Sequence, residues 1–597
     1  MQPSTAEERR TENQQPQKAR NPLKFNALRG YVQRFEQWTL EWVDWSDPDE
    51  WRKRLANTTK ISPADENTPF LEAMRENDVE LEDDIACFIQ PSISSARWER
   101  RVLHIAGFCV GAEFTLHNTI PVDPAVSQLI GAQEPEAWVS DRNWVDETLV
   151  GPRPNYPPIL NNRQLYLVLQ KKRFPEGSQG DVAGPPRRIY IKNPNGASVA
   201  AIIKTTPASQ VEGFRDLFAG YITPTPEPNF ILRESEWWGG CLVISFDIPY
   251  YGISSRKRQD CRTIFNSRKR LRKQLDLDFL HMKGHGLSAD ESASFHDDPI
   301  LHEAVFSFTV TVIKEHYWTV GCFDDDFFEE EPRLPSEDET LVLDGDTDPI
   351  LLKADGNLTK SSRSYALAAL AIALYKTVEH HGNIQDWFKN SLSLHTSDAE
   401  DGSLEKISAK ELQNWIEKFP EALNHVIHST SNLVRKLDHF LEEDVIFGPD
   451  AQPRGVLWQS LQNDAAASRS LLRIKQHRNK LRDIDTELRQ LAIACKEVRR
   501  KRQTDHEGEQ QVITKQLCKI AIAAFVSMIP GTVAQLYSGK PSKDDSEDWP
   551  WYWAMVVFCV LMGIAIAVYL CWQQVRRWFA RVVAFLSETF RAVRGRA

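Results

Sequence analysis

Two uncharged, largely apolar runs near the C-terminus constrain the fold of this chain more than any other feature. They span Ile520–Gly539 and Trp549–Val575, and neither contains Lys, Arg, Asp or Glu. A helix of roughly 20 apolar residues crosses the hydrocarbon core of a bilayer. The sequence therefore predicts a two-helix transmembrane domain over residues 517–575. Pro530 and Gln535 interrupt the first run, which leaves a re-entrant or interfacial hairpin as its alternative.

The charges that flank the two runs predict their orientation. Basic residues precede the first run at Arg499–Arg502 and follow the second from Arg576 onward. The loop between the runs contains an acidic group made of Asp544, Asp545, Glu547 and Asp548. Because basic flanks stay inside, we expect a multi-pass integral membrane protein with both termini in the cytosol. The acidic loop then lies outside, and residues 576–597 form a basic cytosolic tail.

Composition excludes several classes of protein. The chain has 597 residues with 72 Lys and Arg against 83 Asp and Glu, a net charge of −11, so we expect no nucleic-acid partner. Its nine Cys include no CxxC pair and indicate reduced thiols. The first 20 residues lack an apolar core, so we expect a disordered tail over residues 1–22 and no signal peptide.

The sequence predicts two regions within residues 23–355. The first, 23–180, is a helical or mixed extension that includes an aromatic stripe from Leu28 to Trp45 at helical spacing. The second, 181–355, is predicted to be an α/β cytosolic domain with a mixed sheet and an acidic linker at its end. Its predicted strands are Arg188–Lys192, Val199–Thr205, Asn229–Arg233, Cys241–Ile248 and Ala304–Ile313, with Trp318–Phe323 pairing back on the last.

Two charged stretches of this domain each allow more than one interpretation. A basic helix is predicted over Arg256–Leu280, and within it Ser267–Leu275 fits a solvated face better than a nuclear-targeting or phosphate-binding motif. Acidic residues cluster from Asp324 to Asp348. They lack the Gly and the closing Glu of a calcium loop, so an ordinary acidic linker is favoured over a loose cation-binding surface.

Helical patterns dominate residues 356–516. Helices are predicted over Ser361–His381 and within Ser408–Asp444. A long stalk helix is predicted over 455–516, because apolar residues from Leu481 to Val498 repeat at three and four residues and no Pro or Gly interrupts the run before Gly508. The alternative for this stretch is a helical hairpin within one chain. No GxSxG, P-loop, GxGxxG or HExxH motif occurs, so we expect no enzymatic activity and no catalytic residues.

Four short blocks resemble the CorA-like magnesium transporter family. The blocks are Phe246–Tyr251, Leu275–Leu280, His302–Ser307 and Trp318–Phe323. The order of a large α/β domain, a long helix and two C-terminal spans is similar to the same family, most of all to its divergent fungal-type members. The resemblance covers roughly residues 185–580. It implies a homo-oligomer, a pentamer in the family, that carries Mg²⁺ or another divalent cation across a membrane without a bound cofactor.

The signature of that family, Gly-Met-Asn, is degenerate in this chain. Gly539 matches, but Lys540 and Pro541 stand in place of Met and Asn. The resemblance implies a pore mouth at Tyr537, Ser538, Gly539 and Lys540. A ring of Lys540 side chains would oppose cation entry, and the acidic loop could offset it.

The first apolar run has only a few polar residues, and these are the candidates for lining the pore. They are Ser527, Thr532 and Gln535. Their alternative role is hydrogen bonding between packed helices. Two functions follow from the sequence: a cation transporter or channel, or a non-conducting, membrane-anchored regulatory or interaction protein of the same architecture.

Overall fold

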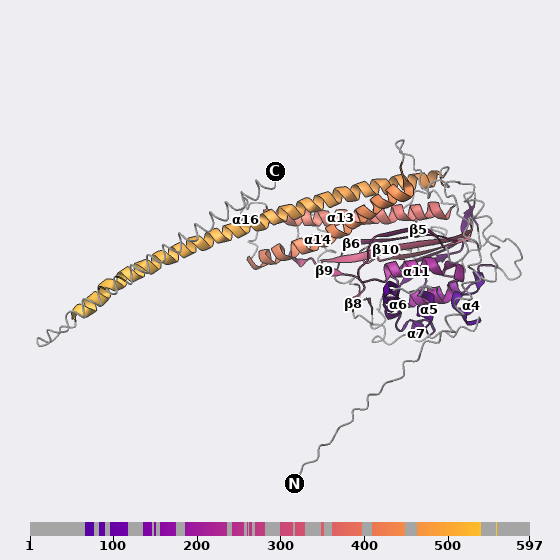
Figure 1. Ribbon diagram of the computed structural model, residues 1–597, viewed down its shortest axis with the longest axis horizontal. Helices are drawn as coiled ribbons and strands as arrows, with labels where there is room; N and C mark the ends of the chain where they lie inside the picture. Colours follow the sequence, from indigo (N-terminus) through magenta and orange to yellow (C-terminus); the bar gives the residue numbers. More distant parts are fainter. Residues whose placement is uncertain are drawn as a thin grey trace, which may run out of the picture. The chain divides into compact units, whose positions relative to one another are not determined.

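The structure is a computed structural model, shown in Figure 1. It describes residues 66–76, 83–89, 96–117, 135–145, 148–150, 156–174, 186–235, 241–255, 260, 262–264, 269–280, 299–314, 317–328, 348–351, 361–396, 409–447, 461, 464–538, 557 and 561. The chain forms two compact units, Met1–Val498 and Arg499–Ala597. The domain boundaries predicted from the sequence within these two units stay predictions. The aromatic stripe from Leu28 to Trp45 also stays a prediction, because it lies outside the described residues.

A seven-stranded mixed sheet organises the first unit. Its order is β1-β4-β11-β10-β6-β5, with β9 paired on β10, and only the β4–β11 pair is parallel among these neighbours. The strands are β1 Glu136–Ser140, β4 Arg187–Lys192, β5 Asn229–Ser235, β6 Cys241–Ser255, β9 Gln274–Asp276, β10 Pro299–Lys314 and β11 Tyr317–Asp324. Two short ribbons pair β2 Asn143–Val145 with β3 Thr148–Val150 and β7 Thr263–Ile264 with β8 Lys269–Arg270. The predicted α/β domain with a mixed sheet is confirmed.

The central hairpin of the sheet follows directly from the sequence. Strand β10 is rich in β-branched and aromatic residues, which favour extended backbone. It pairs with β11 from Phe306 opposite Asp324 to Lys314 opposite Tyr317. It also pairs with β6 over almost its whole length. The predicted strands within β4, β5, β6, β10 and β11 are thus confirmed.

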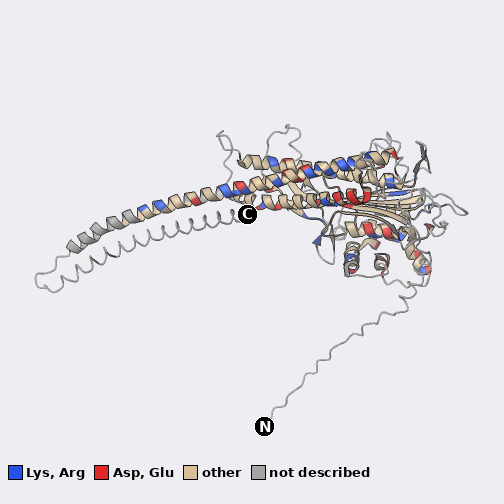
Figure 2. Ribbon diagram, turned by 45° about the horizontal axis from the view of Figure 1, so that its top comes forward, with Lys and Arg blue, Asp and Glu red and all other residues tan. Residues whose placement is uncertain are grey.

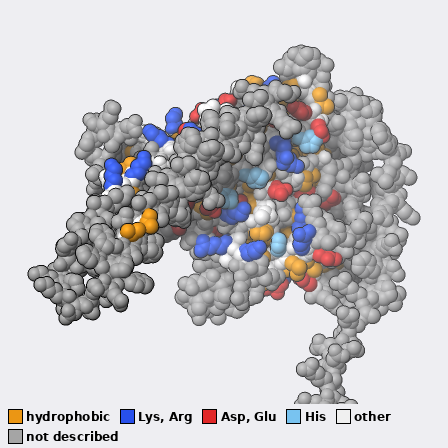
Figure 3. Space-filling view, turned by 60° about the vertical axis from the view of Figure 1, so that its left-hand side comes forward, with side chains coloured by type: hydrophobic (Ala, Val, Ile, Leu, Met, Phe, Trp, Pro, Cys, Tyr) orange, Lys and Arg blue, Asp and Glu red, His pale blue; other side chains and the backbone are white. Residues whose placement is uncertain are grey.

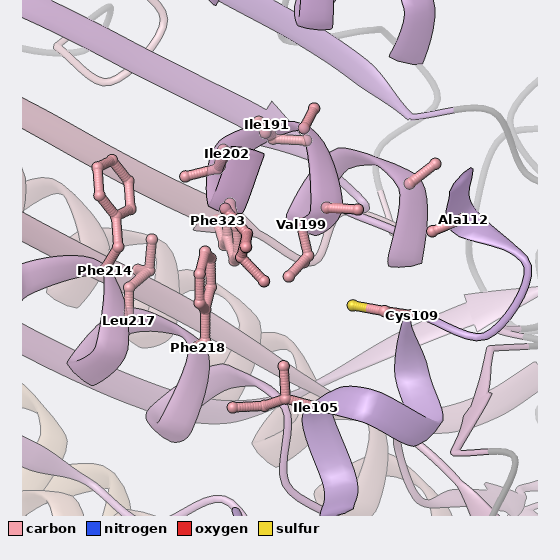
Figure 4. Packing of buried hydrophobic residues seen from close by; sticks show 14 of the residues in the cluster. Ile105, Cys109, Ala112, Ile191, Val199, Ile202, Phe214, Leu217, Phe218 and Phe323 are labelled. Atoms are coloured by element: carbon pink, nitrogen blue, oxygen red, sulfur yellow. The ribbon is translucent and has the colours of Figure 1, made fainter. Parts of the chain in front are cut away.

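One face of the sheet is covered by short helices. They are α4 Phe70–Glu76, α5 Asp84–Ile89, α6 Ala96–Phe108, α7 Ala112–His117, α9 Asn162–Leu169, α10 Gly196–Thr205 and α11 Val211–Tyr221, with the 3-10 turn η1 at Ala208–Gln210. Figure 4 shows how Phe214 and Phe218 of α11 meet Phe323 of β11 in the core on this face. Ile105 and Val199 belong to the same core.

Long helices cover the other face (Figure 1). They are α13 Ser362–Thr396, α14 Ala409–Phe440 and α16 Ala465–Ser538. Helix α14 is followed by a π-helical turn, η5, at Leu441–Val445. A 3-10 turn, η4, follows β9 at Asp278–Leu280. The helices predicted over Ser361–His381 and within Ser408–Asp444 correspond to α13 and α14.

Helix α16 begins ten residues later than the predicted stalk start at 455, and it continues past 516 without ending at Gly508. The first part of its predicted apolar stripe packs within the chain. Leu481 is buried in the core that includes the sheet, and Ile484, Leu488 and Cys495 are buried against α13 and α14. The predicted helix is therefore present, and its stripe up to residue 498 serves the chain's own core.

The expected transmembrane domain is contradicted. Among the described residues, no helix combines the length and the apolar character that crossing a membrane requires. The run from Ile520 forms the end of α16, where Pro530 and Gln535 interrupt it and Lys519 directly precedes it. The second run, Trp549–Val575, lies outside the described residues except for two positions. The predictions of two C-terminal transmembrane helices and of a multi-pass protein with cytosolic termini are thus wrong.

Two local predictions in the α/β domain are also wrong. Val199–Thr205, predicted to be a strand, lies in the helix α10. The predicted basic helix over Arg256–Leu280 is replaced, where described, by β7, β8, β9 and the turn η4. In the second segment a tertiary contact overrides the local pattern, because Arg272 pairs with Asp325 in the core.

Candidate functional site

The predicted pore residues fall at the end of α16 and beyond it. The backbone of Ser527, Thr532, Gln535, Tyr537 and Ser538 is helical. Gly539, Lys540, Asp544, Asp545, Glu547 and Asp548 lie outside the described residues. A pore mouth and a pore lining at these positions stay predictions from the resemblance.

The acidic cluster at the end of β11 is part of the core. Asp324, Asp325 and Asp326 are all buried. They form neither an exposed linker nor a cation-binding surface, which corrects the interpretation of this part of the acidic stretch. Within the described ranges no group of three or more His, Cys, Asp and Glu side chains is placed to hold a metal ion.

Asp325 is the centre of a buried charge network. Its Oδ2 accepts a hydrogen bond from Nε of Arg272 at 2.6 Å, and its Oδ1 accepts one from Nη2 of Arg262 at 2.7 Å. The Tyr221 hydroxyl and the Val305 backbone N–H donate to the same carboxylate. Each carboxylate oxygen thus receives charge-assisted bonds, the strongest class of hydrogen bond in proteins.

This network shifts the titration of Asp325. Burial alone would raise its pKa, but Arg272 and Arg262 hold the pKa of this carboxyl well below its usual range. Asp260 pairs with Arg262 at 2.8 Å, so two carboxylates balance two guanidinium groups. Removing one partner of such a buried set costs about 3–5 kcal/mol, because the remaining charge stays buried.

Asp324 links the sheet to the helical layer. Its Oδ1 accepts a hydrogen bond from Nζ of Lys376 on α13 at 3.0 Å, and its Oδ2 accepts one from the hydroxyl of Tyr190 on β4 at 3.0 Å. Asp348 extends this link, since it accepts bonds from Arg188 of β4 and from Tyr365 of α13, each at 2.7 Å. Both carboxylates therefore fasten α13 to the sheet.

Two histidines are buried near this network. His302 on β10 lies against the rings of Phe327 and Phe328, and burial lowers its pKa to about 4. His381 on α13 accepts a hydrogen bond from the backbone N–H of Tyr251 at 3.1 Å. These contacts are structural and bring no metal-ligand set together.

A second candidate site is an apolar stripe on α16 in the unit that begins at Arg499. Ile513, Leu517 and Ile520 are 55%, 59% and 64% exposed. Their spacing of four and three residues places them on one side of the helix. Figure 2 marks Lys and Arg residues in blue along the preceding turns of the same helix. We call these three residues the α16 stripe.

Sequence reasoning missed the charge network for an identifiable reason. The basic residues of 267–275 carry helical spacing, which predicted a solvated face. Arg272 is instead buried against Asp325. The one available signal was the run of three Asp directly after an apolar strand, where a buried carboxylate needs a buried cation.

No family model and no curated protein matches this chain. The resemblance to CorA-like transporters therefore stays a prediction from short blocks and element order.

Proposed function

We propose that this protein is a self-associating regulatory or interaction protein without enzymatic activity, and that copies of the chain associate through the α16 stripe. The observation that carries the proposal is the exposure of Ile513, Leu517 and Ile520 on one side of a long helix. A large apolar side chain gains about 1.5–3 kcal/mol when it is fully buried. Three such side chains in a row favour a partner helix with the same spacing.

The spacing supports a second copy as that partner. Apolar residues separated alternately by three and four positions form the seam of a coiled coil, and a continuous helix provides the length that such a seam needs. Helix α16 runs from Ala465 to Ser538 without a break. Its basic residues at 499–502 are typical of the polar flanks of such a seam.

The first unit fits the interaction role because its layers are firmly joined. Lys376 and Asp324 tie α13 to the sheet, and Asp348 does so a second time because it accepts bonds from both Arg188 and Tyr365. On the face shown in Figure 3, the described side chains mix basic, acidic and histidine groups. Mixed charge of this kind suits contacts with polar partners rather than with nucleic acid.

Divalent-cation transport stays the other prediction of the resemblance. It depends on membrane-spanning helices, and none was found in the part of the chain that the structure describes. Self-association, by contrast, needs only the α16 stripe and no membrane-spanning helix.

The test is the molecular mass of the full-length protein in solution, measured by light scattering over a range of concentrations. We expect an oligomer, and we expect the double variant Ile513→Glu with Leu517→Glu to shift it toward the monomer. Placing two charges in an apolar seam desolvates them without partners, which costs several kcal/mol.

The matched control is the double variant Gln511→Glu with Lys515→Glu. Both positions are exposed and lie on the opposite side of the same helix. This control changes the charge at least as much as the test variant does, and we expect its mass to equal that of the wild type. A monomeric wild type, or equal dissociation of both variants, would overturn the proposal.

A further inference from the structure

Strand β6 is longer than β5, its neighbour at the edge of the sheet. It pairs with β10 up to Ser255 but with β5 only from Cys241 to Asp247. After Asp247, this edge of β6 has no strand beside it among the described residues. Helices α13 and α14 both pack on β6 (Figure 1). Buried backbone groups on such an edge need hydrogen-bond partners from other elements.

Side chains of the two helices provide these partners. The N–H of Tyr251 donates to Nε2 of His381 on α13 at 3.1 Å. Oγ of Ser429 on α14 donates to the carbonyl of Pro249 at 3.4 Å. Residues 249 and 251 are two positions apart, so their backbone groups point to the same edge of the strand. His381 and Ser429 therefore replace a neighbouring strand at this edge.

The hydrogen bonds of His381 define the protonation state of its ring. A backbone N–H can only donate, so Nε2 carries a lone pair and the proton of the neutral ring is on Nδ1. Nδ1 lies 3.0 Å from Oγ1 of Thr430 on α14. The hydroxyl proton of Thr430 is donated to the carbonyl of Val426 at 2.8 Å, so Oγ1 accepts from Nδ1. This chain of bonds requires a neutral His381.

The same bonds are shielded from water. His381 and Thr430 are 0% exposed, and Tyr251 is 4% exposed. Burial lowers the pKa of His381 from 6.5 to about 4. Between these two values the unfolded chain binds a proton at this position and the folded chain does not, so the stability from His381 is lost as the pH falls.

The other titratable groups on the elements around His381 have contacts of their own or lie at the surface. The Tyr251 hydroxyl donates to Glu303 of β10 at 3.4 Å, and the Tyr251 ring lies 6.4 Å from that of His425 on α14. The others are Lys376 bonded to Asp324, His380 stacked on Tyr250, His428 bonded to Asn432, Asp485 of α16 bonded to Ser431, and the exposed Asp278 of η4. Burial is the cause that shifts the pKa of His381, and none of these described groups offsets it.

We propose that His381 is a pH-sensitive switch at the contact of β6, α13 and α14, and that this contact opens when the ring is protonated. A proton from solvent adds to Nε2, and the new N–H then faces the N–H of Tyr251. Two donors cannot form a hydrogen bond with each other, and the charged ring is buried without a partner. The switch lies in the first unit and does not rest on self-association through the α16 stripe.

The test compares urea unfolding of the full-length wild type and of His381→Gln at pH 8 and at pH 5. A Gln amide accepts and donates hydrogen bonds but does not titrate in this range. From pH 8 to pH 5 the unfolding equilibrium constant of the wild type should rise about 30-fold relative to that of the variant, as pKa values of 6.5 and about 4 require. The two proteins share every other titratable group, so those contributions cancel in the ratio.

A second neutral variant, His381→Asn, should give the same change in the ratio, because it does not titrate either. It also decides the test if the Gln side chain prevents folding. The matched control is His428→Gln, which removes an exposed histidine from α14. We expect the ratio for this control to change less than about threefold between the two pH values. A ratio that is the same at both pH values for the His381 variants, or that changes equally in the control, would overturn the proposal.

Discussion

At the scale of single residues, Asp247 is a buried acid whose environment disfavours its charge. It lies on β6, and burial raises its pKa to about 7. Its Oδ1 accepts a hydrogen bond from Ser307 at 2.7 Å. Its hydrogen-bond donors Ser307 and Asn229 are uncharged, whereas two arginines donate to Asp325, so the ionised form of Asp247 is not compensated in the same way.

The consequence is a pH dependence of the free energy of unfolding. The folded-state pKa of Asp247 lies above the unfolded value of 3.8, so the folded state binds more protons between these values and loses stability as the pH rises through them. Asp247→Asn removes this loss. We expect the variant to gain about 2–3 kcal/mol relative to the wild type between pH 5 and pH 8, measured by urea unfolding.

Asp386→Asn provides the control, since Asp386 is exposed on α13. Its stability relative to the wild type should be the same at both pH values, within about 0.5 kcal/mol. If Asp247→Asn behaves like this control, the Asp247 carboxyl is ionised without penalty in the folded protein.

At the scale of elements, α10 shows where the sequence pattern failed. Val199–Thr205 is rich in β-branched residues and was predicted to be a strand. Hydrogen bonds at the N-terminus of α10 stabilise the helix. Oδ1 of Asn195 accepts hydrogen bonds from the N–H groups of Ala197 and Ser198, and Oγ of Ser198 accepts one from the N–H of Asn195. The sequence signature of a capping box has Glu or Gln at the position of Ser198, so this cap was not recognisable from the sequence pattern.

The cap gives the prediction for this element. Asn195→Ala should lower the free energy of unfolding by about 1 kcal/mol, because the N–H groups of the first turn lose their acceptor. Asn195→Ser should retain most of the stability, since Ser is also a good N-cap residue. Chemical unfolding of both variants against the wild type is the measurement. Equal losses in the two variants would show that burial of the Asn195 side chain, rather than capping, determines its contribution.

Other elements were predictable to different degrees. Strands β6, β10 and β11 were found because alternating β-branched and aromatic residues mark a buried sheet. The structure of the segment from Arg256 to Leu280 was not predicted. Its Arg272 is held by Asp325, which is 53 residues away in the sequence and leaves no local pattern.

At the scale of the whole first unit, the sheet is shared by two cores. Val305 of β10 packs in the core with α11, and its neighbour Phe306 packs in the core with α13. Consecutive residues of a strand point to opposite faces, so strands β1, β4, β10 and β11 each contribute to both cores. The two helical layers should therefore lose their structure together.

Hydrogen exchange in two cavity-forming variants tests this coupling. Leu370→Ala removes packing on the α13 face, and Phe218→Ala removes it on the α11 face; each should cost about 2–5 kcal/mol. If the sheet couples the layers, either variant accelerates exchange in peptides from both α11 and α13 by the same factor, about 100-fold for 3 kcal/mol. If each layer opens independently, acceleration stays on the mutated face, and the sheet then acts as a rigid partition between two separately stable layers.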